Sequence, residues 1–321
     1  MPKITQWERH IGRHLRLRDL FVLLTVVESG SMSKAAAQLG VSTPSVSTLI
    51  AALEHELGTQ LLDRTPKGVL PTLQGEALLA RARAAFDELR QGIQDLAFMS
   101  DPSAGEVRIG CPESISAFLV FVIERLARDY PRMRFHVQQV HWPPSDFPEL
   151  RNRGADVVLA RLASPPTGNR LGEDLDASVL FDDPFVVVVG SGNKLARRRK
   201  VDLAELADEA WIVTPPDVLA GRFVSDAFEA RGLTTPTPRI ETSSIHLRNN
   251  LAARDQFLAV LPRSVLRLSA QRYGLKELPI RLSARPSPVA IVTLRGRALN
   301  PAVQIFIKYA RETARSFVHS K

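Results

Sequence analysis

The sequence predicts an α/β protein with three consecutive parts: a mainly helical amino-terminal unit, a long helix and a carboxyl-terminal α/β region. Two short helical patterns and a hairpin pattern fill residues 31–75. The stretch 72–99 is rich in Ala, Leu, Arg, Glu and Gln and contains few helix breakers. After Gly105, apolar runs alternate with helical patterns, which is typical of βαβ units and a largely parallel sheet.

The amino-terminal unit contains two short helices in immediate succession. Ser31 or Ser33 can cap the first helix, and Gly40 lies where that helix would end. The second helix begins at Ser42 or Thr43, whose side chains can accept its unpaired amide hydrogens. Two short helices joined by a tight turn are the elements of a helix-turn-helix, whose second helix enters the major groove of DNA.

The second helix has an apolar face and a face of small or polar groups. Its apolar residues follow the spacing of one helical stripe and are Val46, Leu49, Ile50, Leu53 and Leu57. Small and polar groups on the remaining surface can approach a DNA groove without steric cost. Together with one residue of the first helix, the predicted DNA contacts are Ser33, Thr43, Pro44, Ser45, Ser47 and Thr48.

Residues 61–72 predict a hairpin, because two short extended runs flank a turn that contains Pro66 and Gly68. Such a hairpin would form a wing beside the helix-turn-helix. Arg64 and Lys67 would then lie near the DNA phosphates and complete the predicted contacts. A small helical bundle with a hairpin fits the same pattern, so patterning alone leaves that alternative open.

The order of residues in this unit is distinctive. It comprises Phe21, Val26-Val27-Glu28-Ser29-Gly30-Ser31, Ala35-Ala36, Leu39, Val41-Ser42, Pro44, Val46-Ser47, Ile50, Leu53-Glu54, Leu57-Gly58, Leu61-Leu62, Arg64-Thr65, Leu70-Pro71-Thr72 and Gly75. This dense, ungapped order resembles the amino-terminal domain of LysR-type transcriptional regulators. The resemblance implies a winged helix-turn-helix that binds double-stranded promoter DNA, with RNA polymerase as a further partner.

Three residues depart from the family pattern on the surface that would face DNA. The family usually has Gln at the position of Thr43, and commonly Arg at the positions of Thr48 and Ala51. The threonines can still donate a hydrogen bond to a phosphate or a base edge. The bidentate base contacts of Gln and Arg are lost, so the target sequence cannot be inferred by analogy.

The positive charge is not concentrated in the DNA-binding unit. The chain has 321 residues and a formal net charge of +8, yet residues 1–100 contain 11 Lys and Arg against 10 Asp and Glu. A local cluster is a better candidate footprint than the total charge. It consists of Arg9, Arg13, Arg16 and Arg18 before the first helix, together with Arg64 and Lys67 in the wing. A solvated basic arm is the alternative. Residues 1–14 form that arm, and whether it contacts DNA, is disordered or reflects a misassigned start stays open.

Several features favour a cytoplasmic protein. No apolar run approaches the roughly 20 residues needed to span a bilayer, and the amino terminus lacks the apolar core of a signal peptide. Cys111 is the one cysteine, which excludes an internal disulfide. Without a resolving partner in the chain, Cys111 is interpreted as an inert buried thiol rather than a redox switch. By the resemblance, the protein associates with the bacterial nucleoid and has no membrane partner.

Residues 73–100 predict a linker helix about 40 Å long. Its apolar positions alternate steps of four and three residues: Leu78, Ala82, Ala85, Leu89, Gly92 and Leu96. A helix with such a seam needs a partner. Either it pairs with a second copy to give a homodimer or homotetramer, or it packs on its own domain. Pro102 and Gly105 then end the helix in a short linker.

The order of strands and helices after Gly105 resembles the effector-binding region of the same family. The resemblance implies two α/β lobes of periplasmic-binding-protein type within residues 105–315. The first lobe would hold 105–161 and 267–315, and the second lobe 162–266. The helix-turn-helix unit is accordingly assigned to residues 15–72. A weaker match over 243–266 suggests the subgroup that responds to sugars or aromatic-acid catabolites.

An effector site is expected at the carboxyl ends of the strands, where helix amino termini present amide hydrogens to anions. The candidate effector contacts on the two lobes are Ser114, Ser116, Arg161, Thr214, Ser243 and Ser244. Simple helix capping is the alternative for the serines. Arg161 could pair with an anionic effector or form a salt bridge to a neighbouring acid.

Together these features predict a sequence-specific transcriptional regulator controlled by a small metabolite of unknown identity, with no other cofactor and no metal. An enzyme is not expected, because the sequence lacks a recognisable nucleophile, metal or phosphate-loop pattern. A free solute-binding protein would fit residues 105–310 but would lack the helix-turn-helix. The remaining alternative is a ligand-independent DNA-binding regulator whose lobes serve only oligomerisation.

Overall fold

The computed structural model describes residues 15–66, 68–140, 146–162, 171–216, 219–280, 282 and 288–319. The chain divides into two compact units, Met1–Gln91 and Gly92–Lys321. The boundary lies within the long helix, and each unit has its own hydrophobic cores.

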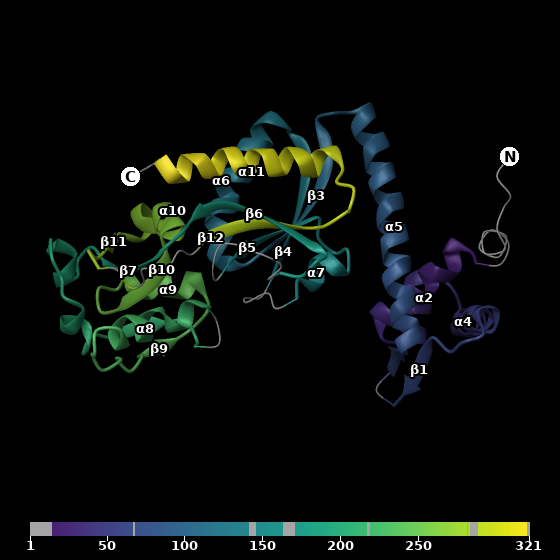
Figure 1. Ribbon diagram of the computed structural model, residues 1–321, viewed down its shortest axis with the longest axis horizontal. Helices are drawn as coiled ribbons and strands as arrows, with labels where there is room; N and C mark the ends of the chain where they lie inside the picture. Colours follow the sequence, from purple (N-terminus) through teal and green to yellow (C-terminus); the bar gives the residue numbers. More distant parts are fainter. Residues whose placement is uncertain are drawn as a thin grey trace. The chain divides into compact units, whose positions relative to one another are not determined.

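Among the described residues, the first unit contains three helices, a two-stranded sheet and the first part of the long helix α5 (Leu73–Ser100) (Figure 1). The helices are α2 (Leu17–Ser29), α3 (Met32–Leu39) and α4 (Thr43–Leu57). Helix α3 ends at Gly40, whose φ of 67° lies in the left-handed region that glycine adopts without steric cost. Val46, Ile50 and Leu53 of α4 are buried in the core of this unit. The predicted helix-turn-helix is therefore confirmed.

The wing follows the helices. Strands β1 (Leu62–Thr65) and β2 (Gly68–Pro71) pair in antiparallel register, with Leu62 opposite Pro71. Helix α5 (Leu73–Ser100) begins directly after β2. Gly75 in its first turn packs so closely that a Cβ atom there would lie 2.1 Å from the carbonyl oxygen of Leu61. This close approach accounts for a glycine at that position of the motif.

The second unit begins with a sheet whose strand order is β4-β3-β5-β12-β6. Helices α6 and α11 cover one of its faces, and α11, which contacts β3 and β6, lies alongside β6 in Figure 1. A short helix, α7, packs on the other face. The elements of this lobe are β3 (Ala104–Cys111), η1 (Glu113–Ile115), α6 (Ser116–Asp129), β4 (Arg132–Gln139), α7 (Pro148–Arg151), β5 (Val157–Arg161), β6 (Leu175–Asp182), β12 (Pro288–Leu294) and α11 (Pro301–His319).

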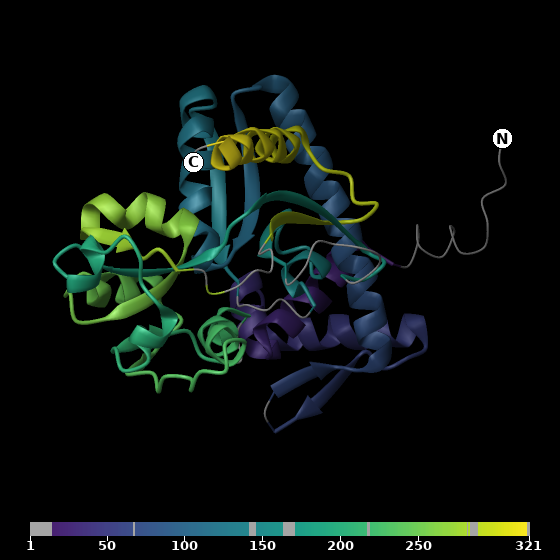
Figure 2. The same ribbon diagram turned by 60° about the vertical axis from the view of Figure 1, so that its left-hand side comes forward.

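The second lobe has the strand order β11-β7-β10-β8-β9 (Figure 2). One core lies between this sheet and its short helices η2, η3 and α8, and another lies against α9 and α10. Its elements are β7 (Phe185–Gly190), η2 (Lys194–Arg197), η3 (Leu203–Leu206), β8 (Trp211–Val213), η4 (Leu219–Arg222), α8 (Phe223–Glu229), β9 (Ile240–Glu241), α9 (Ile245–Ala252), β10 (Leu258–Pro262), α10 (Arg263–Tyr273) and β11 (Leu275–Glu277).

The sheets differ from the prediction of a largely parallel sheet. In each of them, two of the four strand pairings are parallel and two are antiparallel. The antiparallel pairings in the first sheet involve β12, which pairs with both β5 and β6. Strand β12 enters this sheet from the second lobe, so no βαβ crossover fixes it in a parallel orientation.

The lobe boundaries also differ from the predicted ones. Strand β6 belongs to the first sheet, so the first change of lobe lies at Asp183–Pro184 instead of after residue 161. Helix α10, strand β11 and Leu282 belong with the second lobe, so the return follows residue 282 instead of 266. Strand β6 lies at the edge of its sheet and contains exposed polar residues, which hid it from the apolar pattern.

Candidate DNA-binding and effector sites

Helix α4 presents a surface of small and polar side chains on the side away from its buried stripe. Thr43, Pro44 and Thr48 are exposed there, and Ser47 is half-buried beside them. Ser42 caps the helix by accepting a hydrogen bond from the amide of Ser45, at 3.3 Å. The cap fixes where the helix begins, and therefore which residues face outward.

The wing is tied to the recognition helix by a side-chain contact. Arg64 of β1 donates a hydrogen bond to the hydroxyl of Ser47 at 3.0 Å, which brings together two of the predicted DNA contacts. Glu54 of α4 accepts hydrogen bonds from the amides of Leu61 and Leu62, at 2.8 and 3.1 Å. These contacts hold the exposed Arg64 beside α4. Lys67 lies outside the described residues.

The remaining predicted DNA contacts, Ser33 and Ser45, are exposed serines that hydrogen-bond to other serines. The hydroxyl groups of Ser31 and Ser33 are 3.0 Å apart at the start of α3. Ser31 occupies the cap position there, although its side chain accepts no capping hydrogen bond. The hydroxyls of Ser42 and Ser45 are 2.7 Å apart at the start of α4.

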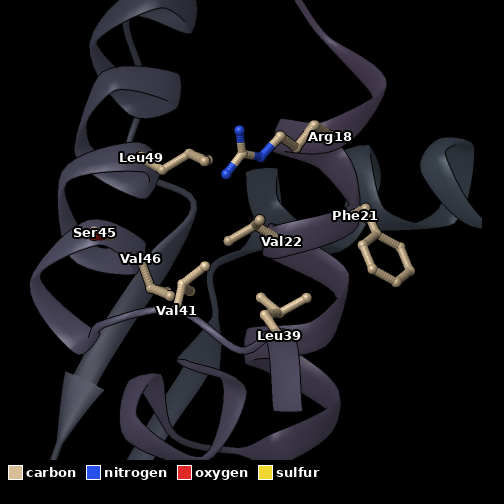
Figure 3. Close-up of a pocket in the computed structure, with 8 residues that line it drawn as sticks. All are labelled: Arg18, Phe21, Val22, Leu39, Val41, Ser45, Val46 and Leu49. Carbon is tan, nitrogen blue, oxygen red and sulfur yellow. The ribbon is translucent and has the colours of Figure 1, made fainter. Parts of the chain in front are cut away.

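A small apolar pocket of about 140 Å³ flanks α4 within the same unit. Figure 3 shows Val46 and Leu49 of α4 on one side and Val22 of α2 on the other, with Arg18 extending across one end toward Leu49. Val41, in the turn between α3 and α4, lines it as well. The pocket is hydrophobic apart from Arg18 and Ser45, and it places a cation beside the first turns of the recognition helix.

Arg161, a predicted effector contact, is engaged within the protein. Its guanidinium donates to a carboxylate oxygen of Asp183 at 2.7 Å and stacks on the ring of Phe185, 4.7 Å from its centroid. The same carboxylate accepts hydrogen bonds from the amide and hydroxyl of Ser264. Of the two interpretations of Arg161, the structure contains the salt bridge to a neighbouring acid.

Two of the predicted serines form hydrogen bonds with backbone groups of their own helix ends. Ser244 caps α9 by accepting a hydrogen bond from the amide of Leu247 at 3.2 Å. Ser116, at the start of α6, donates its hydroxyl to the carbonyl oxygen of Glu113 at 2.7 Å. Ser114 is half-buried in η1, immediately before α6. The capping alternative accounts for the bond made by Ser244.

Thr214 and Ser243 are brought together by a residue that the sequence analysis did not single out. Arg248 of α9 donates to the hydroxyl of Thr214 at 3.1 Å, to the carbonyl oxygen of Val260 at 2.7 Å and to that of Ser243 at 3.3 Å. Burial lowers the pKa of Arg248 to about 10, and the nearby negative charge of Glu113 opposes that shift.

Glu113 links the two lobes at this point. It belongs to η1 of the first lobe, and its carboxylate accepts a hydrogen bond from the amide of His246 at 3.3 Å, in the first turn of α9. A carboxylate thus lies at the positive end of a second-lobe helix. The predicted contacts from both lobes, Ser114 on one side and Thr214 and Ser243 on the other, adjoin residues of this Glu113–Arg248 cluster.

Comparisons with known proteins agree with this architecture. The family model described as LysR substrate binding domain matches residues 100–315, and that of the bacterial regulatory helix-turn-helix protein, lysR family, matches residues 17–76. The chain belongs to the LysR family. It is a LysR-type transcriptional regulator with a DNA-binding helix-turn-helix domain and an effector-binding domain.

Known LysR-type regulators resemble this chain over most of its length. GalR of Pseudomonas putida is 26% identical over 298 residues, which are 92% of this chain and 73% of that protein. GbpR of Rhizobium radiobacter is 30% identical over 261 residues, 78% of this chain and 81% of that protein. Full-length OxyR from Pseudomonas aeruginosa has a similar fold, with a TM-score of 0.66, 22% identity and coverage of 94% and 95%.

The helices of this LysR regulator were compared with the length and apolar composition that a membrane span requires. Among the described helices, none is by itself long and apolar enough to cross a membrane, and α3 with α4 passes that test only as a pair bent by 108°. That pair is the helix-turn-helix, whose apolar side chains are buried in the core of the first unit.

Cys111 is buried at the end of β3, and burial raises the pKa of its thiol to about 12, as expected for an unreactive cysteine.

Proposed function

We propose that this LysR-type regulator recognises promoter DNA through α4 and the wing, and that a small metabolite bound beside η1 and α9 controls it. The exposed face of α4 with Arg64 held beside it is the observation that supports DNA recognition most directly. Hydroxyl groups suit single hydrogen bonds to phosphates or base edges, whereas Arg64 suits a phosphate. The DNA contacts we propose are Ser33, Thr43, Pro44, Ser45, Ser47, Thr48 and Arg64.

For the effector we propose the region where the lobes meet at Glu113 and α9. Ser114, Thr214 and Ser243 are our candidates for contact with the ligand, since they flank this junction from both lobes. A ligand that binds one relative arrangement of the lobes more tightly than another shifts the population toward it. The strength of control is limited by that difference in affinity.

We further propose that the protein acts as a homodimer or homotetramer. On α5, Leu89, Ile93 and Leu96 are exposed by 49%, 68% and 66%, and their spacing places them along one side of the helix. An exposed apolar stripe of this kind suits pairing with a second copy. Bound to promoters, the oligomer would act at the bacterial nucleoid in the cytoplasm and affect access of RNA polymerase.

A genome-wide footprint of the purified protein, made at two salt concentrations, tests this function. We expect a few protected promoter sites with dyad symmetry, because two helix-turn-helix units related by a twofold axis require paired half-sites. Protection at such sites should survive the higher salt better than background binding, since base contacts do not release counterions. Uniform protection that disappears with modest salt would contradict sequence-specific recognition.

A further inference from the structure

Three arginines are buried in the second unit among its described residues, and one of them differs from the others. Arg161, Arg248 and Arg297 are exposed by 2%, 2% and 6%. Arg161 pairs with Asp183 at 2.7 Å, and Arg297 pairs with Asp156 at 2.6 Å. Arg248 forms no salt bridge with any carboxylate that the structure describes.

Among the described residues, no carboxylate bonds directly to Arg248, although the charge of Glu113 acts on it. Its hydrogen bonds go to two carbonyl oxygens and one hydroxyl, all of them neutral groups. Its Nε is buried and has no hydrogen-bond partner. With a pKa of about 10, the side chain is still a cation at neutral pH. A buried cation whose direct contacts are all neutral is costly, so an anion in direct contact with Arg248 would be favoured.

The charged group that acts on Arg248 comes from the other lobe. Glu113 lies on η1, and its carboxylate accepts a hydrogen bond from the amide of His246. That amide is at the start of α9, the helix that contains Arg248. Helix amino termini bind carboxylates and phosphates through such amides. The bond is long, at 3.3 Å, and Glu113 is only half-buried. A ligand anion can therefore compete with Glu113 for this position.

We propose that Arg248 is the counter-ion of a carboxylate on the effector, and that Glu113 occupies the same anion position when no effector is bound. This inference rests on the proposed effector control and specifies its ligand class. The effector is a small carboxylate, and the hydroxyls of Ser114 and Thr214 suit one that is itself hydroxylated. Displacement of Glu113 releases a contact between the lobes, which couples ligand binding to their arrangement.

Thermal unfolding of the full-length protein tests the proposal with a fixed panel of probes. Gluconate and benzoate are each compared at about 10 mM and constant ionic strength with the uncharged glucose and benzyl alcohol. We expect at least one carboxylate to raise the Tm while its uncharged counterpart does not. The dependence of the Tm on the concentration of that carboxylate then gives its apparent affinity for the wild type and for each variant.

The variants separate the anion site from general stability. Arg248→Met should weaken carboxylate binding at least about tenfold, since it removes a charge-assisted interaction. Arg254→Met, at an exposed arginine just after α9, is the matched control and should bind as the wild type does. Arg248→Lys keeps the charge and should retain part of the affinity. Glu113→Gln leaves the hydrogen bonds of Arg248 in place and should bind the carboxylate more tightly.

Three results would overturn the proposal. The first is equal carboxylate affinity of the wild type and Arg248→Met. The second is weaker carboxylate binding by Glu113→Gln than by the wild type. The third is that neither gluconate nor benzoate raises the Tm. If only the uncharged probes raise the Tm, the anion proposal fails while effector binding stands. The footprint needs no probe molecule, so a failure of DNA recognition is detected separately.

Discussion

Asp183 lies where the chain leaves the first sheet for the second, and its carboxylate is the hub of a buried network. It accepts hydrogen bonds from Arg161 and from both the amide and the hydroxyl of Ser264. The network therefore joins the end of β5, the crossover and the start of α10. Removing one member of a buried pair leaves the other charge uncompensated, which costs far more than losing an exposed pair.

Arg161→Met should accordingly destabilise the protein by about 3–5 kcal/mol, or on the order of 10 °C in Tm. Arg295→Met is the matched control, because Arg295 pairs with Asp176 at 2.8 Å on the surface. We expect the control to lose less than about 1 kcal/mol. Adding Asp183→Asn to Arg161→Met should restore part of the loss. Equal Tm values for Arg161→Met and Arg295→Met would refute a structural role for this ion pair.

Arg64 provides a second prediction for a single residue. Arg64→Gln should weaken binding to all DNA sequences by a similar factor and reduce the salt dependence of log K by about 0.9, the value for one phosphate contact. Arg81→Gln removes the same charge from an exposed position of α5 and should leave that slope nearly unchanged. Fluorescence anisotropy titrations over a salt series measure both. Loss of discrimination between sequences, with an unchanged slope, would instead assign Arg64 to a base.

Helix α5 has different surroundings along its length. Near its start, Gly75, Leu79 and Ala82 are buried, whereas Leu89, Ile93 and Leu96 further along are exposed. The heptad seam predicted from the sequence thus contains a part that packs on its own unit and a part whose apolar side chains remain exposed. Packing on its own unit is therefore observed for the first part of the helix, and pairing with a second copy stays our proposal for the exposed part.

Ile93→Glu should shift the oligomer toward monomer, because it places a charge on the exposed stripe of α5. Sedimentation velocity at several protein concentrations measures the shift. Gln271→Glu adds a single negative charge at an exposed position of α10 and should leave the assembly unchanged. If Ile93→Glu sediments as the wild type does over the whole concentration range, the stripe is not the interface.

For the whole molecule, the sequence predicted those features that depend on local patterns. The helix-turn-helix, the wing and the long helix follow from caps, apolar spacing and a dense family motif. The mixed sheets and the place of β6 were missed, since β6 is an edge strand whose pairing with β12 joins residues far apart in sequence. The role of Arg248 was missed for a related reason: its partners lie on other elements, with Thr214 just after β8 and Val260 on β10.

We propose that a ligand in the effector domain changes how the regulator occupies its promoter. The most direct measurement is a footprint at one protected promoter, with and without the carboxylate that raises the Tm, for wild type and Arg248→Met. We expect the carboxylate to alter the extent of protection by the wild type. The Arg248→Met protein should keep the ligand-free footprint in both conditions. An identical wild-type footprint with and without saturating carboxylate would contradict effector control.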